Sequence, residues 1–147
     1  MEKLKILNKK EIKRLLEMLD KHWGFKGEME YAFLQSEKYK IYIANKEIFN
    51  LDLSKVKINS YGLYFAEVRN GIRLSIEGSQ IVGPKATKNV IELNDEELKE
   101  WMSGADLDKE TDSNDFVILK HGDDFLGTGK STKEGKILNY VPKTRRI

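Results

Sequence analysis

The final segment of the chain, residues 116–147, limits the possible folds more than any other stretch. An apolar run at 116–119 is followed by a polar turn and by a second run that ends in Gly127-Thr128-Gly129-Lys130. A closing run then leads into a basic terminus. Short apolar runs separated by turns rich in Gly and Asp are typical of β-strands. We therefore predict three successive strands, with the closing strand including residues 139–146.

The same segment carries an unusual share of the positive charge. From Lys130 onward there are six cations and one carboxylate, Glu134, which gives about +5 in a chain of net charge +2 and leaves about −3 for residues 1–129. Residues 92–115, in contrast, hold ten carboxylates and two lysines. A basic edge beside an acidic flank indicates a surface that meets phosphate in a defined orientation.

Composition excludes several classes of protein. The chain has 147 residues, 39% of them hydrophobic and 34% charged, which suits one ordinary domain or two small ones. Since no apolar run approaches the roughly 18 residues of a membrane helix and the first residues lack a secretory signal, we expect a cytoplasmic protein. The absence of cysteine excludes disulfides, thiolate metal sites and a cysteine nucleophile.

The N-terminal part predicts a helix followed by a strand. Asn8 can cap a helix over 8–21, whose apolar residues recur at helical spacing and which is followed by Gly24. Its opposite, basic face is more typical of a solvated surface than of a binding site. In the strand over 38–43, Tyr39, Ile41 and Ile43 share one face. Tyr42, on the other face, either stacks on a base or packs across the sheet, and we favour packing. Residues 48–56 remain unassigned.

A second unit begins near residue 59. The run 61–68 leads to the turn signal Asn70-Gly71, and a short helix within 73–83 ends at Pro84. A short strand at 90–93 precedes a helix whose capping box is Asn94 with Glu97 and which ends near Gly104. These elements predict an α+β protein with an N-terminal α/β domain over 1–58 and a second domain over 59–147.

Gly127-Thr128-Gly129-Lys130-Ser131 resembles the end of a phosphate-binding P-loop. The complete pattern requires a glycine where this chain has Asp124, and the 16 residues after Ser131 are too few for a nucleotide-binding fold. We instead expect these glycines to let a strand bend or bulge as a small barrel closes.

No catalytic or metal-binding constellation stands out among the titratable residues. His121, Asp123 and Asp124 fall on a polar turn, where Gly and Asp are favoured for backbone reasons. His22 lies beside Trp23 at a helix end and suits capping or packing. The carboxylates of 95–115 lie in a solvated context that gives no reason for a raised pKa. We therefore expect no cofactor, no metal and no enzymatic activity.

The C-terminal segment is the candidate RNA-binding site. Its cations can hold phosphates, while Asn139 and Tyr140 can contact an exposed base. A basic tail that only improves solubility is the alternative. The predicted phosphate-binding residues are Lys130, Lys133, Lys136, Lys143, Arg145 and Arg146.

The order of motifs resembles a known RNA-binding module. A helix ending in glycine is followed by a strand, a turn, Leu-Gly-x-x-Lys over 126–130, and Gly-x-x-Leu-Asn-x-x-Pro-Lys-x-x-Arg over 135–146. This order resembles the C-terminal module of Sun/Fmu-type rRNA cytosine-5 methyltransferases across roughly residues 60–147. The resemblance implies a PUA-like mixed β pseudo-barrel that binds structured RNA. It gives conserved or RNA-contacting roles to Lys130, Asn139, Pro142, Lys143 and Arg146.

The N-terminal part is similar to the small α/β domain that precedes the PUA domain in archaeal tRNA-guanine transglycosylase-like and ribosome-biogenesis proteins. The chain lacks the methyltransferase domain, its cysteine nucleophile and a Gly-rich site for S-adenosylmethionine. We therefore expect a non-catalytic protein that binds structured rRNA or tRNA in ribosome biogenesis or RNA modification. One alternative is an adaptor whose acidic helix recruits or assists an RNA methyltransferase in trans. The other is a small enzyme acting on RNA or a nucleotide, for which the residues give little support.

Overall fold

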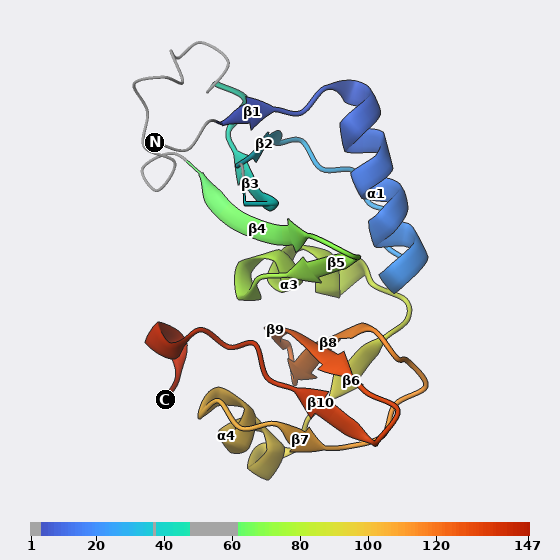
Figure 1. Ribbon diagram of the computed structural model, residues 1–147, viewed down its shortest axis with the longest axis vertical. Coiled ribbons are helices and arrows are strands. Elements are labelled where there is room, and N and C mark those ends of the chain that lie inside the picture. The colour runs from blue at the N-terminus through green and yellow to red at the C-terminus, as the bar shows by residue number, and fades with distance from the viewer. Residues whose placement is uncertain (1–3, 37, 48–61) are drawn as a thin grey trace.

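Two five-stranded sheets with a short helix between them form an α+β fold (Figure 1). The computed structural model describes residues 4–36, 38–47 and 62–147. The first sheet has the order β1-β2-β3-β4-β5 and the second the order β6-β8-β9-β10-β7. The strands of the first sheet are β1 (Lys5–Ile6), β2 (Ala32–Gln35), β3 (Lys40–Ala44), β4 (Leu63–Val68) and β5 (Ile72–Leu74). Those of the second are β6 (Val90–Glu92), β7 (Leu107–Asp108), β8 (Phe116–His121), β9 (Asp124–Ser131) and β10 (Lys136–Leu138).

Helix α1 (Lys9–Trp23) covers one face of the first sheet, as Figure 1 shows. Asn8 and Glu11 form a capping box at its start, and Gly24 ends it with φ 66°. Leu15, Leu19 and Trp23 of α1 are buried in the same core cluster as Phe33, Ile41 and Ile43 of the sheet. The predicted helix is confirmed and extends two residues further than expected.

Alternation along β3 divides its side chains between two cores. Ile41 and Ile43 face α1, whereas Tyr42 packs on the opposite face with its ring centroid 5.7 Å from that of Tyr64. Tyr42 is therefore a cross-strand packing residue. The placement of Tyr39 in this strand was wrong: its φ of 63° puts it in the turn before β3, with the Arg69 guanidinium 5.5 Å from its ring.

The turn at Asn70-Gly71 joins β4 and β5 as predicted, with φ of 53° and 121° at the two residues. The predicted boundary between residues 58 and 59 lies outside the described residues, as does the unassigned stretch 48–56. Beyond that position β4 pairs with β3, so the first sheet extends to Leu74. The division into domains over 1–58 and 59–147 remains a prediction.

The short helix predicted after β5 is α3 (Ile76–Val82), and it lies between the two sheets (Figure 1). A Cβ at Gly78 would lie 2.2 Å from the Phe65 carbonyl oxygen of the first sheet. A Cβ at Gly83 would lie 2.2 Å from the Phe125 ring of the second. These contacts explain why glycine occupies both positions despite its low helix propensity. The chain then continues through Pro84 in the 3₁₀ turn η3 (Gly83–Lys85).

In the second sheet β6 runs parallel to β8, and the other neighbours are antiparallel. Helix α4 (Asp95–Met102) begins with the predicted Asn94–Glu97 capping box. Its Trp101 is fully buried in a core with Leu107, Val117 and Ile137. One face of the mixed sheet therefore packs against α4, whereas Ile118 and Phe125 of the same sheet belong to the core of the first sheet.

The β8–β9 hairpin contains the irregularity expected at the glycines. Its register shifts between Ile118 and Lys120, opposite the part of β9 where Gly127 has φ 89°. The Gly127 amide leaves the ladder and donates to the Ser79 hydroxyl at 2.8 Å. This bulge confirms the bend at Gly127.

The closing strand is shorter than predicted. β10 ends at Leu138, and the segment after it contains only the 3₁₀ turn η4 (Lys143–Arg145). The Asn139 amide donates to an Asp106 carboxylate oxygen at 2.7 Å, and the Val141 amide donates to the Asn139 side chain at 2.7 Å. Since these amides are bound by side chains and Pro142 has no amide proton, no strand forms over 139–146.

Candidate nucleic-acid interface

Cations and aromatic rings contact one another along a surface that crosses from the second sheet to the first. The Lys130 ammonium is 5.3 Å from the Phe116 ring, and that ring is 5.3 Å from the Tyr140 ring. The Arg73 guanidinium lies 4.6 Å from the Tyr140 ring. On the first sheet, the Lys40 ammonium lies 5.5 Å from the Tyr64 ring. We call this set the cation–aromatic strip: Lys130, Phe116, Tyr140, Arg73, Tyr64 and Lys40.

Strand register explains the second-sheet half of the strip. Phe116 of β8 is opposite Lys130 of β9, and Lys130 is opposite Leu138 of β10. Directly opposed residues project from the same face of a sheet. The chain leaves β10 after Leu138, and the ring of Tyr140 then packs edge-on against Phe116.

Carboxylates hold two of the cations in place. Arg73 pairs with Glu67, its cross-strand neighbour, at 2.5 Å, and Lys130 lies 3.4 Å from an Asp115 oxygen. Burial raises the pKa of the Tyr64 hydroxyl above its ordinary 10.0, an effect that the positive charge of Arg73 opposes. The hydroxyl is therefore protonated at neutral pH and can donate a hydrogen bond.

A groove with a volume of about 460 Å³ adjoins the strip. One wall comes from the first sheet and includes Tyr64 and Arg73. The other consists of Tyr140, Val141, Pro142, Thr144 and Arg145 of the C-terminal segment, and the two walls meet where Arg73 lies over the Tyr140 ring. The floor is the start of α3 and the bulge of β9 around Gly127. Both sheets thus contribute to one concave surface.

The structure brings some of the predicted RNA-binding residues together at this surface. Lys130 and Tyr140 belong to the strip. Arg145 lines the groove and is ion-paired with Glu77 of α3. Lys143 is exposed in η4, the same short turn.

The other predicted residues lie elsewhere. Lys133 is exposed in the turn between β9 and β10, and Lys136 lies 3.6 Å from an Asp108 oxygen, beside acidic residues. Asn139 donates to the carbonyls of Trp101 and Ala105 at 2.7 and 2.9 Å. Its amide therefore fastens the C-terminal segment to the end of α4.

Arg146 also contacts the protein itself. Its Nε donates to the Val141 carbonyl at 3.1 Å, and its side chain lies over Gly104, where a Cβ would be 2.5 Å from Nε. The roles toward RNA of all eight predicted residues, at the strip and elsewhere, remain predictions.

Sequence reasoning did not find Arg73, Phe116, Tyr64 or Lys40 as site residues. None of them stands in a basic run, and Lys40 and Tyr140 are a hundred positions apart in the chain. The alternation of Tyr with Lys at 38–42 did suggest a base-stacking residue in this strand, but the residue that it suggested was Tyr42 and not Lys40.

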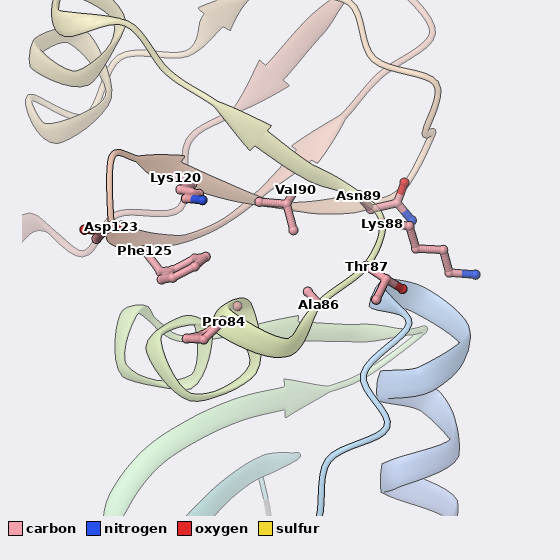
Figure 2. A pocket seen from close by; sticks show the side chains of 10 residues that line it. Pro84, Ala86, Thr87, Lys88, Asn89, Val90, Lys120, Asp123 and Phe125 are labelled. Atoms are coloured by element: carbon pink, nitrogen blue, oxygen red, sulfur yellow. The ribbon is translucent and has the colours of Figure 1, made fainter.

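A second hollow, of about 590 Å³, lies between the segment from Gly83 to Val90 and the tip of the β8–β9 hairpin (Figure 2). The Phe125 ring contributes to it with the Lys120 ammonium 5.6 Å away, while Lys88 points away from Phe125. Asn89 and Thr87 use their side chains to bind the carbonyls of His22 and Gly24 at the end of α1. This hollow has mixed charge, because Asp123 lies at its rim.

The two histidines have structural neighbours. His121 Nε2 is 2.8 Å from an Asp95 oxygen at the start of α4, and His22 packs against the Trp23 ring. Within residues 4–36, 38–47 and 62–147, no group of three or more His, Asp or Glu residues is placed to hold a metal ion. None of the described helices has the length and apolar character needed to cross a membrane.

Comparison with known proteins agrees with this architecture. Residues 88–147 match a family model described as the PUA domain of the methyltransferase RsmF. A solved structure, described as a conserved PUA domain protein from Thermoplasma acidophilum, superposes with a TM-score of 0.63 at 12% identity, covering 94% of this chain and 93% of that one. No curated protein matches the chain in sequence. The chain therefore has a PUA-like α+β fold, and its C-terminal part is confirmed to resemble the PUA module of Sun/RsmF-type methyltransferases.

Proposed function

We propose that the protein is a non-catalytic RNA-binding protein whose contact surface is the cation–aromatic strip. The continuous series of contacts from Lys130 through Phe116 and Tyr140 to Arg73 carries this proposal. PUA domains generally bind RNA, so the family match at 88–147 supports the same role.

The cations and the aromatic rings of the strip contribute to RNA affinity in different ways. Lysine and arginine side chains neutralise phosphates and release counterions, which provides most of the affinity. Aromatic rings stack on unpaired bases, and a guanidinium that stacks on a ring can serve both purposes. Exposed Lys143 and Lys133 would extend the phosphate contacts beyond the strip.

Structured rRNA or tRNA is the expected class of RNA, in the context of ribosome biogenesis or RNA modification. This part of the proposal rests on the resemblance to a module of rRNA methyltransferases and includes a cytoplasmic location. Positioning of RNA, without chemistry on it, is the expected mechanism.

Crosslinking tests the function and the surface together. The protein is irradiated with ultraviolet light in cells, the bound RNA is sequenced and the crosslinked peptides are identified. We expect enrichment of rRNA or tRNA and adducts on the peptides that contain Tyr140 or Phe116. Recovery of no RNA above that of an uncrosslinked control, or adducts confined to α1, would contradict the proposal.

An adaptor for an RNA methyltransferase is the second candidate. Asp95, Glu96 and Glu100 are exposed on α4, whereas Glu97 is turned to Lys109 at 3.0 Å. Such a face suits a basic protein partner. Capture of a methyltransferase that survives nuclease treatment and is lost in the variant with Glu96→Gln and Glu100→Gln would favour this role over direct RNA binding.

A further inference from the structure

The groove beside the strip has the size and lining of a site for one nucleotide. We propose that it accepts a single unpaired nucleotide of the bound RNA, with the base against its apolar walls and the flanking phosphates at its cationic rim. This inference rests on the proposed RNA binding and specifies the class of RNA: one with a bulge, a loop or a single-stranded end.

Two exposed apolar side chains line this groove. They are Leu63 of the first sheet, which is 45% exposed, and Tyr140 of the C-terminal segment, which is 40% exposed. Tyr64 and Pro142 continue the two walls. Flat aromatic and apolar surfaces facing a gap of about 460 Å³ match the faces of a nucleobase.

Several polar groups at the floor of the groove make hydrogen bonds within the protein. The Leu126 carbonyl accepts from the Trp101 indole at 3.2 Å, and the Thr128 hydroxyl donates to the Leu74 carbonyl at 3.0 Å. The Ser75 hydroxyl donates to the Tyr64 carbonyl at 2.6 Å. Because these groups already bond within the protein, we expect packing on the face of the base to contribute more to binding than recognition of its edge.

Charge at the rim suits RNA phosphates. The groove lining contains three cations and one carboxylate, which gives it a net charge of +2. These charged residues are Lys40, Arg73, Arg145 and Glu77. The pair between Arg145 and Glu77 links the C-terminal segment to α3 across the groove, and a phosphate can replace Glu77 as the partner of Arg145.

A continuous duplex does not fit this description. In A-form RNA the base faces are stacked inside the helix, and only the backbone and the groove edges are accessible. A nucleotide outside the stack, in contrast, presents its base face and both flanking phosphates. A free nucleotide shares this chemistry, so the experiment must separate the two sources.

The test compares two RNA hairpins that differ only by one bulged 2-aminopurine nucleotide. We expect the protein to bind the bulged hairpin roughly tenfold more tightly, with a change in 2-aminopurine fluorescence, as expected for stacking of one base. A mononucleotide added alone should compete only weakly.

Thr144→Trp serves as the groove-filling variant, since Thr144 is exposed on the groove wall. It should remove the preference for the bulge and retain the affinity for the paired hairpin. Thr87→Trp, in the second hollow, is the matched control and should retain both.

Three outcomes would overturn the inference. Equal affinity for the two hairpins with unchanged fluorescence would refute the nucleotide site and leave RNA binding intact. Tight binding of the free mononucleotide would assign the groove to a small ligand instead. Failure to bind either hairpin would refute RNA binding together with the inference.

Discussion

Arg73 of the first sheet stacks on Tyr140 of the C-terminal segment, with its guanidinium carbon 4.6 Å from the centre of the ring. Glu67 fixes the guanidinium from one side, and Phe116 contacts the edge of the tyrosine ring. The two sheets are therefore joined at the proposed RNA-binding surface itself. A surface assembled in this way is already ordered before a ligand arrives, which lowers the entropic cost of binding.

The Arg73–Tyr140 contact should be measurable in stability. We expect Arg73→Gln and Tyr140→Leu to be non-additive, with a coupling of about 0.5–1 kcal/mol, the range of exposed cation–π pairs. Urea unfolding of the two single variants and the double variant gives this value. Additive free energies of unfolding would show that the stacking contributes nothing.

Asn139 should be important for folding. Its side-chain amide makes three hydrogen bonds, to Trp101, Ala105 and Val141. Asn139→Ala removes all three bonds and leaves the Ala105 carbonyl and the Val141 amide without these partners, so we expect a loss of about 1–3 kcal/mol in the free energy of unfolding. Thr132→Ala, in the turn before β10, is a milder control. Equal stability of the Asn139→Ala protein and the wild type would contradict this role.

Gly129 should not tolerate a side chain. A Cβ there would lie 2.5 Å from the Trp101 ring, 2.6 Å from Ile137 and 2.9 Å from the Leu138 carbonyl oxygen. Because the last of these is backbone, Gly129→Ala should destabilise the protein by about 1–3 kcal/mol. Gly122→Asn is the control: the site is open, and Asn tolerates its φ of 59°. Thermal melts that rank the two variants in the opposite order would contradict the packing described for β9.

The start of α4 should be sensitive to acid. The Asn94 backbone amide, together with Lys109, lowers the pKa of Glu97 below its ordinary 4.5, although partial burial opposes this. A carboxyl whose pKa is lower in the folded state than in the unfolded state stabilises the protein at any pH above its unfolded-state pKa. This stabilisation is lost as the pH falls through the folded-state pKa. The stability difference between wild type and Glu97→Gln should therefore be present at pH 7 and shrink below about pH 4.5. A difference that is constant with pH would contradict it.

Sequence patterns predicted the local elements well because their signals are local. The cap at Asn8, the capping box at Asn94, the Asn70-Gly71 turn and the bulge at Gly127 all depend on residues within a few positions of each other. The extent of the closing strand was predicted wrongly for the opposite reason. The Asn139 amide is bound by Asp106, 33 positions away, and only the folded chain reveals that contact.

In the candidate site, too, some residues could be predicted from the sequence and others only from the fold. Lys130 and Tyr140 were accessible to sequence reasoning, since they stand in the basic C-terminal segment. Arg73 and Phe116 join them only through strand register and through the packing of one sheet on the other. Charge and composition therefore indicated the kind of ligand, whereas the surface that binds it could be defined only from the fold.

The salt dependence of RNA affinity tests the strip most directly. The measurement compares the wild type with two triple variants. In the strip variant, Lys40, Arg73 and Lys130 are changed to Gln. In the control variant, Lys10, Lys13 and Arg14 on the exposed face of α1 are changed to Gln. Each protein is first shown to be folded, and the logarithm of its affinity for a structured RNA is followed against the logarithm of salt concentration. If the strip binds phosphates, its variant should lose affinity and its slope should fall by about 2 to 3, while the control retains the wild-type slope. Equal slopes for the wild type and the strip variant, or a larger loss in the α1 control, would contradict the account.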